Sequence, residues 1–229
     1  MLRTRAGVGI LSWCVAWALA FDGRVIATAA EITGRVVMAP RGASSAQQAA
    51  ANPYPGMLGS LPICGLPKTS ADDIHDVVLS LPEAAGTTSK PSSKAEIRQT
   101  HQSFLPRVLA IPVGTTVDFP NDDPIFHNAF SYSKSKRFDL GKYGKGKSAS
   151  VTFDKPGIVQ VFCDIHSSMS AYVWVAPTRF VTQPDATGEF VLHDVSPGTH
   201  VLEIWHPERG TQRRTVEVPA TGVRIEIAL

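Results

Sequence analysis

The fold of this chain is most clearly indicated by VQVFCDIHSSMSAYVWV, residues 159–175. Its first half is a β-like run that ends at Cys163, and a second β-like run begins at Ala171 after a short polar turn. Within this turn, His166 and Met169 follow Cys163 at intervals of three residues. A loop that joins two strands allows a thiolate, an imidazole and a thioether to point at one central atom. The stretch therefore predicts two strands with a cluster of candidate metal ligands in the loop between them.

Strand signals continue on both sides of this stretch. Short β-like runs, separated by Pro and Gly turns, recur at close spacing from residue 95 to 176 and again from 189 to 228. The 229 residues include 18 Gly and 17 Pro, and the sequence contains no amphipathic helical pattern of useful length. We therefore predict an all-β fold that contains a small β-sandwich or barrel at residues 95–176.

The residue types in the 163–169 loop favour copper. Soft sulfur together with imidazole suits a metal that cycles between Cu(I) and Cu(II), with two His and one Cys in a trigonal plane and a weak axial Met. The loop supplies a single His, so a second imidazole has to come from elsewhere in the chain. His127, in NDDPIFHNAF, is the best candidate, because it follows a turn and stands at the start of a predicted strand.

The order of these motifs resembles that of the cupredoxin family. Residues 114–119 read GTTVDF, and they are followed by Asn121-Asp122, by His127-Asn128 and by the Cys-x2-His-x2-Met loop, whose spacing is similar to that of amicyanin. The resemblance covers residues 95–176 and implies one type 1 (blue) copper ion. It implies the following roles: equatorial ligands His127, Cys163 and His166, axial ligand Met169, and Asn128 as an outer residue that helps to pin the thiolate loop.

Other roles for Cys163 stay open at this point. Of the three cysteines, Cys14 lies in the N-terminal segment that we expect to be removed on export, so Cys64 and Cys163 remain. Two cysteines in an oxidising compartment commonly form a disulfide, and Cys64 is then the available partner. A zinc site is disfavoured because Met is a poor zinc ligand, and a haem attachment site would need another Cys just before a His. A cysteine nucleophile that acts with His127 and Asn128 is disfavoured because adjacent strand residues point to opposite faces.

A second module follows the copper segment. Residues 179–229 resemble the carboxypeptidase regulatory-like (transthyretin-like) β-sandwich through GEFVL, a Pro-Gly turn and an alternating strand. Runs that match the opening strands of that fold, ITGRV and VVL, stand before the copper segment. We therefore predict that the copper domain is inserted into a split domain, with a tandem order as the alternative. The predicted ranges are 1–30 for a signal peptide, 31–94 for N-terminal strands and linker, 95–177 for the copper domain and 178–229 for the second β module.

The N-terminal residues predict export to the periplasm. Arg3 and Arg5 precede an apolar stretch, and small residues suited to cleavage follow near Ala29. We expect no membrane span after cleavage, since the apolar stretch is shorter than the roughly 20 residues that cross a bilayer. The formal net charge of +2 is too small to indicate nucleic acid or a membrane surface as a partner.

Together these features predict one-electron transfer to or from a protein redox partner, a dehydrogenase or a cytochrome, without enzymatic activity. The expected docking surface combines residues near the exposed edge of His166 with part of a basic stretch: Ile125, Phe126, Ser167, Ser168, Lys134, Lys136 and Arg137. Two alternatives stay open. One is a copper-binding or delivery protein with the same ligands, and the other is a non-catalytic β-sandwich interaction module without a redox role.

Overall fold

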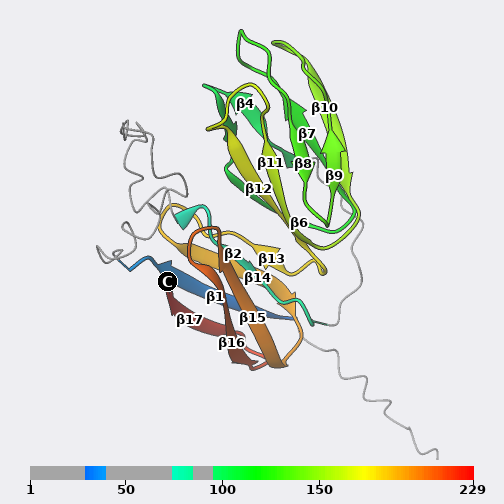
Figure 1. Ribbon diagram of the computed structural model, residues 1–229. Helices are drawn as coiled ribbons and strands as arrows, with labels where there is room; N and C mark the ends of the chain where they lie inside the picture. The colour runs from blue at the N-terminus through cyan, green and yellow to red at the C-terminus, as the bar shows by residue number, and fades with distance from the viewer. Residues whose placement is uncertain (1–28, 40–73, 85–94) are drawn as a thin grey trace, which may run out of the picture.

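The computed structural model describes residues 29–39, 74–84 and 95–229. These residues form strands β1 to β17, which are arranged in several sheets (Figure 1). The predicted all-β fold class is confirmed. Residues 1–28 of the predicted signal peptide, the segment with Cys64 and residues 85–94 of the predicted N-terminal strands and linker lie outside the described residues, whereas Ala30, the last residue of the predicted signal peptide, is the first residue of β1. Across the part of the chain that is described, no helix has the length and apolarity needed to cross a membrane.

Residues 95–176 form one layered body, here called sandwich I, in the upper part of Figure 1. One sheet has the strand order β6-β12-β11-β8-β9, a second has the order β10-β7-β3, and β4 and β5 form a separate hairpin. The strands are β3 (Ala95–Glu96), β4 (Arg98–Thr100), β5 (Ser103–Leu105), β6 (Val108–Pro112), β7 (Thr115–Pro120), β8 (Phe130–Tyr132), β9 (Arg137–Asp139), β10 (Ser148–Phe153), β11 (Gly157–Phe162) and β12 (Ser170–Ala176).

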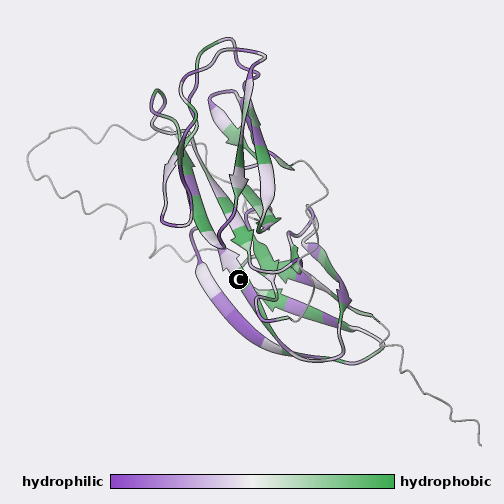
Figure 2. Ribbon diagram, turned by 90° about the vertical axis from the view of Figure 1, so that its right-hand side faces the viewer, coloured by the Kyte–Doolittle hydropathy of each residue, from purple (hydrophilic) through white to green (hydrophobic). Residues whose placement is uncertain are grey.

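Alternation of side chains along the strands builds the core of sandwich I. In β7, Val117 and Phe119 are buried and the intervening residues are more exposed. In β11, Val159 and Val161 are buried in the same way. Because successive strand residues point to opposite faces, each sheet places one apolar face inward, and the residues of both faces form one cluster. Figure 2 shows this pattern as hydrophobic and hydrophilic bands that follow one another along the strands.

Strands that precede and follow sandwich I in the sequence form a second body, sandwich II. Its sheets have the orders β14-β1-β17 and β13-β2-β15-β16. β1 is antiparallel to β14 and parallel to β17, and β2 lies between β13 and β15. The strands are β1 (Ala30–Val37), β2 (Val78–Ser80), β13 (Val181–Thr182), β14 (Glu189–Val195), β15 (Gly198–His206), β16 (Gly210–Val218) and β17 (Val223–Ala228). The segment that forms sandwich I therefore stands, in the sequence, between two parts of sandwich II.

An apolar junction joins the two sandwiches. Residues of both bodies make up one buried cluster: Val78, Val108, Trp174, Ala176 and Trp205. The ring centroids of Trp174 and Trp205 lie 5.0 Å apart, within the range of favourable aromatic pairs. Arg107 of sandwich I forms ion pairs with Asp76 and, at 3.0 Å, with Glu208. Side-chain packing and ion pairs, and not only the connecting chain, hold the two bodies together.

Gln183 links the backbones of the two bodies by hydrogen bonds. Its Oε1 accepts from the Ala110 N–H at 3.0 Å, and its Nε2 donates to the carbonyl oxygens of His75 at 2.8 Å and Val108 at 3.2 Å. We expect Gln183→Ala to lower the free energy of unfolding by about 1–2 kcal/mol, because these backbone groups lose their partner. Urea unfolding measures the change.

The control for this prediction is Gln212→Ala. Gln212 is exposed on β16, where a surface substitution should change the free energy of unfolding by no more than about 0.5 kcal/mol. Equal effects of the two substitutions would contradict the proposed importance of Gln183.

Candidate metal centre

Three of the predicted ligands converge at the end of sandwich I that lies away from sandwich II. The Sγ of Cys163 lies 4.0 Å from the Nδ1 of His127 and 4.0 Å from the Nδ1 of His166. The two Nδ1 atoms are 3.0 Å apart. Among the described residues, these three form the one group of His, Cys, Asp and Glu side chains whose candidate ligand atoms all lie within 4.8 Å of one another.

The spacing of these atoms fits a metal ion. A point equidistant from the three atoms lies about 2.2 Å from each, close to the roughly 2.0–2.3 Å at which zinc binds His nitrogen and Cys sulfur in proteins. Two imidazoles and one thiolate in a triangle are the donors that suit copper in electron-transfer sites. The residues present therefore fit copper in both geometry and chemistry.

The loop that follows β11 positions Cys163 and His166. Phe162, the last residue of β11, pairs with Ser170 of β12, so the ladder ends directly before Cys163. The Cys163 N–H donates to the Met169 carbonyl at 3.2 Å, and the Met169 N–H donates to the His166 carbonyl at 3.0 Å. Met169 is 1% exposed and belongs to the same core cluster as Cys163. The fourth predicted ligand is thus buried within the loop that carries two of the others.

A neighbouring segment holds the backbone of His127, whose side chain is fully buried. The His127 N–H donates to the Tyr143 carbonyl at 3.2 Å, and the Tyr143 N–H donates to the His127 carbonyl at 3.0 Å. Buried Asn121 donates from Nδ2 to the carbonyl oxygens of Ile125 at 2.9 Å and Tyr143 at 2.8 Å. These hydrogen bonds fix the chain on both sides of the imidazole.

A buried carboxylate contacts the outer nitrogen of the same imidazole. The Oδ2 of Asp123 lies 2.8 Å from the Nε2 of His127. Burial acts to raise the pKa of Asp123. Hydrogen bonds from the Gln102 N–H, the His127 ring and the His101 N–H outweigh burial, so the pKa of this carboxyl lies below its ordinary value. Asp123 is therefore an ionised acceptor, the type of partner that commonly orients metal-binding histidines.

Tyr143 is a half-buried polar residue near the cluster. Burial raises its pKa to about 12, with a further contribution from the nearby Cys163, although a hydrogen bond from Gln99 acts in the opposite direction. The hydroxyl therefore stays protonated at neutral pH and donates to the Phe119 carbonyl at 2.7 Å. Its role is to join the 140–147 loop to β7.

Neither Asp123 nor Tyr143 is among the residues predicted from the sequence. A carboxylate four residues before His127 is a local signal that could identify Asp123. No comparable signal exists for Tyr143, because its contact with His127 depends on a loop that returns from a distant part of the chain.

Asn128 lies beside His127 and forms a hydrogen bond that leads away from the thiolate loop. Its Nδ2 donates to Asp139 at 2.9 Å, and Asp139 also accepts from the Gly141 N–H at 3.0 Å. The Oδ1 of Asn128 is buried and has no hydrogen-bond partner among the described residues. The role expected for Asn128, that of pinning the loop with Cys163, stays a prediction.

One group of the predicted docking residues lies at the metal cluster. The loops that carry His127 and His166 expose four of them: Ile125, Phe126, Ser167 and Ser168. Phe126 is 61% exposed. Ile165, which was not predicted, adds a further exposed apolar side chain to the same region. The half-buried His166 is therefore bordered by apolar and small polar groups.

The basic group of predicted docking residues lies at the other end of the sheet. Its members are in or next to the turn between β8 and β9: Lys134, Lys136 and Arg137. Ser135 of this turn lies against Gly157, the first residue of β11, whereas Cys163 follows the last residue. At about 3.3 Å per residue, the strand separates this turn from Cys163 by roughly 20 Å. The structure does not bring these cations to the metal cluster.

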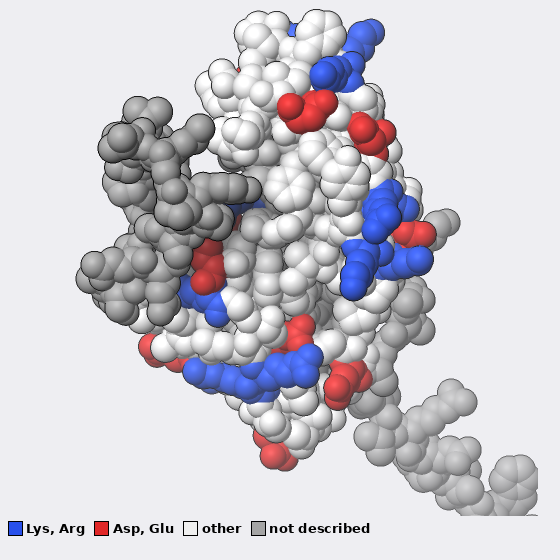
Figure 3. Space-filling model, in the orientation of Figure 1, with Lys and Arg blue, Asp and Glu red and all other residues white. Residues whose placement is uncertain are grey.

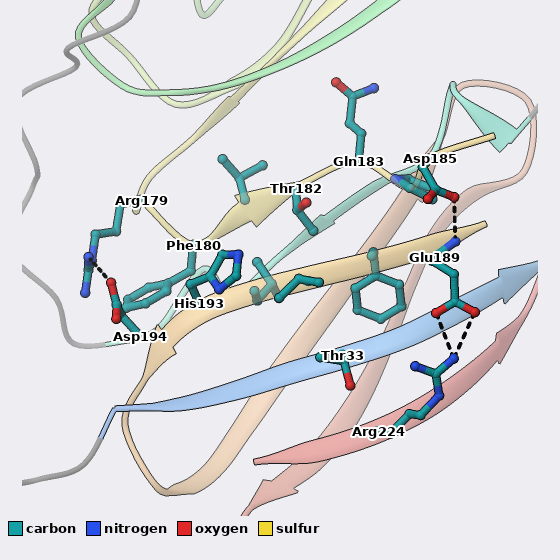
Figure 4. Close-up of a pocket in the computed structure, with 15 residues that line it drawn as sticks. Thr33, Arg179, Phe180, Thr182, Gln183, Asp185, Glu189, His193, Asp194 and Arg224 are labelled. Atoms are coloured by element: carbon teal, nitrogen blue, oxygen red, sulfur yellow. Dashed lines mark hydrogen bonds and ion pairs between the residues drawn. The ribbon is translucent and has the colours of Figure 1, made fainter. Parts of the chain in front are cut away.

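A cleft of about 700 Å³ lies in sandwich II, between β13 and β14 (Figure 4). Its charged side chains are largely paired with each other, Arg179 with Asp194 and Arg224 with Glu189. None of the residues predicted for the metal cluster or the docking surface lines this cleft. The cleft therefore gives no indication of a role in metal chemistry.

No model of a protein family and no curated protein matches the chain. Solved structures of copper proteins do match it in part. A purple cupredoxin from Nitrosopumilus maritimus is 27% identical at a TM-score of 0.33, over 36% of this chain and 100% of that chain. A variant of amicyanin in the Cu(I) form is 18% identical at a TM-score of 0.34, over 42% of this chain and 97% of that chain.

A third match corrects one expectation. A copper-containing nitrite reductase from Thermus scotoductus is 25% identical at a TM-score of 0.36, over 61% of this chain and 28% of the reductase. The expectation that the chain has no enzymatic activity is withdrawn, because this similar structure is an enzyme and the described residues show nothing that excludes catalysis. The solved structures that the chain resembles in part thus include a cupredoxin, amicyanin and a copper-containing reductase.

Proposed function

We propose that this chain is a type 1 (blue) copper protein that transfers single electrons. The observation that carries the proposal is the triangle of two imidazole nitrogens and one thiol sulfur around a point at metal-binding distance. His127, Cys163 and His166 are the proposed equatorial ligands of one copper ion, and Met169 is the proposed axial ligand. Copper bound by these donors supplies a one-electron Cu(II)/Cu(I) couple.

The surroundings of the donors favour electron transfer over metal exchange. His127 is 0% exposed and Cys163 is 5% exposed, so water has little access to these two donors. Backbone hydrogen bonds close the loop of Cys163 and hold the segment of His127. A site whose donors are held in place by the protein needs little rearrangement between oxidation states, whereas delivery of the metal requires that the donors separate.

The half-buried His166 is the proposed point of electron exit. The proposed docking surface, for a redox protein with an apolar contact face, consists of four exposed residues of the two loops that carry the histidines: Ile125, Phe126, Ser167 and Ser168. Figure 3 shows that the upper end of the molecule is largely uncharged on the face displayed, with a few charged side chains beside it. We propose only a long-range role for the three basic residues near the turn between β8 and β9, Lys134, Lys136 and Arg137. Their positive charges would attract an acidic partner and raise the rate of encounter, because electrostatic attraction acts over longer distances than direct contact does.

The proposal also covers the domain organisation of the chain and its location in the cell. We infer that a copper domain is inserted into a transthyretin-like domain. We also infer that the protein is periplasmic. Support for the insertion comes from the pairing of β1 with β14 and β17, and of β2 with β13 and β15.

The test is a titration of the full chain with Cu(II), followed by visible absorption. We expect an intense blue or green thiolate-to-copper band that saturates at one copper per chain and is absent from Cys163→Ala. Absence of the band from the unmodified protein, with Cys163 recovered in a disulfide to Cys64, would refute the copper proposal.

Voltammetry and a chelator separate electron transfer from delivery. A reversible couple, with slow loss of copper to a Cu(I) chelator, is expected for electron transfer. Rapid and complete loss to the chelator would instead favour a copper-delivery protein with the same ligands.

A further inference from the structure

The turn between β4 and β5 has an unusual backbone. Two residues form this turn, His101 and Gln102, and both have positive φ angles, 51° and 56°. Such two-residue hairpin turns are normally made by Asn-Gly or Gly-Gly, because side chains with a Cβ are strained in this conformation. Strained backbone of this kind persists where the surrounding structure requires it, often beside a functional site.

The strained turn delivers two hydrogen bonds to one carboxylate. The His101 N–H donates to Asp123 Oδ1 at 2.7 Å, and the Gln102 N–H donates to Asp123 Oδ2 at 2.9 Å. The left-handed conformation of both residues points two successive N–H groups in a common direction. Each oxygen of the carboxylate thus has its own backbone donor.

The same carboxylate holds the imidazole of His127. Its Oδ2 lies 2.8 Å from the His127 Nε2, and the Asp123 N–H donates to the buried Asn121 Oδ1 at 2.9 Å. Asp123 is 8% exposed and His127 is 0% exposed, so neither group can exchange these contacts freely for water. The position of the carboxylate is therefore determined by the turn, by Asn121 and by its own backbone.

We propose that Asp123, held by the His101-Gln102 turn, is a positioning residue that keeps the proton of His127 on Nε2 and leaves the Nδ1 lone pair free to bind the metal. This inference rests on the proposed copper function. A carboxylate that accepts from the outer ring nitrogen fixes both the tautomer and the orientation of a ligand histidine, and it increases the basicity of the ligand nitrogen. The left-handed conformation of both turn residues thereby has a use, because in it their two N–H groups reach the two oxygens of Asp123.

The test begins with the metal-free full chain. Nitrogen-15 NMR of the His127 ring is expected to show the Nε2–H tautomer in the unmodified protein and an increased Nδ1–H population in Asp123→Ala. Copper affinity, measured in the same variant by competition with a chelator, is expected to fall about 10- to 100-fold. Asp122→Ala is the matched control, since this neighbouring carboxylate is exposed and pairs with Arg98. It should leave tautomer and affinity unchanged.

Two further variants separate positioning from simple structural damage. Asp123→Asn keeps the size of the side chain but removes its charge and one acceptor oxygen, and it should shift the tautomer and the affinity in the same direction by less. The double change His101→Asn with Gln102→Gly keeps both backbone N–H groups and relieves the strain, so it should raise stability and leave the His127 tautomer unchanged.

The outcomes distinguish the two proposals. An unchanged tautomer and unchanged copper affinity in both Asp123 variants would overturn the positioning role, even if the unmodified protein binds copper. A second outcome is that the His127 tautomer shifts as expected in the Asp123 variants, but the unmodified protein gives no thiolate-to-copper band. The proposed copper function would then be wrong, whereas the positioning of His127 by Asp123 would be confirmed.

Discussion

His166→Gly is expected to lose the intense thiolate-to-copper band, and millimolar imidazole is expected to restore it. Removal of one of the proposed equatorial ligands should weaken copper binding by more than about 100-fold. This exceeds the loss that is typical when a residue hydrogen-bonded to a metal ligand is removed. Because His166 is only half-buried, its removal should open a path from solvent through which free imidazole can reach the metal. Visible absorption with and without imidazole measures both steps.

His127→Gly is the matched variant for this experiment. It removes the same chemical group, but from a side chain that is 0% exposed and that is enclosed by the core of sandwich I. Imidazole from solvent should therefore restore the band poorly or not at all. Equal rescue of the two variants would contradict the difference in accessibility, and an unchanged band in His166→Gly would contradict its role as a ligand.

Gly34→Ala is expected to destabilise the protein strongly without altering the metal cluster. Gly34 lies on β1, between β14 and β17. A Cβ at this position would lie 2.3 Å from the Ile225 carbonyl oxygen and 2.8 Å from the Phe190 ring. A backbone oxygen in a sheet cannot move aside without opening the ladder, so we expect a loss of about 3 kcal/mol or more in the free energy of unfolding, at the upper end for overpacked cores. Urea unfolding provides the measurement.

Gly144→Ala is the control for this substitution. A Cβ at position 144 would meet only the ring of Phe126, at an ordinary contact distance of 3.6 Å. The free energy of unfolding should change by no more than about 0.5 kcal/mol. Equal stability of the two variants would contradict the expectation that the close packing of β1 between β14 and β17 requires glycine at position 34.

The local patterns of the sequence are sufficient for the strands and for one part of the candidate site. Alternation of apolar residues, as in β7 and β11, depends on the side-chain period of a strand and can be recognised without knowledge of the neighbours. Cys163, His166 and Met169 stand in one short loop, so their proximity follows from chain connectivity. His127 was predicted through a resemblance, and its distance of 4.0 Å from the Cys163 sulfur is a property of the folded chain.

Contacts between distant segments were decided by the tertiary structure alone. The turn at His101 and Gln102 meets Asp123 because β4 and β5 fold back toward the loop before β8, and no local pattern encodes that approach. The basic residues at 134–137 follow His127 closely in the sequence, yet an extended hairpin carries them to the opposite end of the sheet. Sequence determines which side chains can form a metal site, whereas the lengths and pairing of strands determine which of them meet, because a strand separates residues by about 3.3 Å at each step.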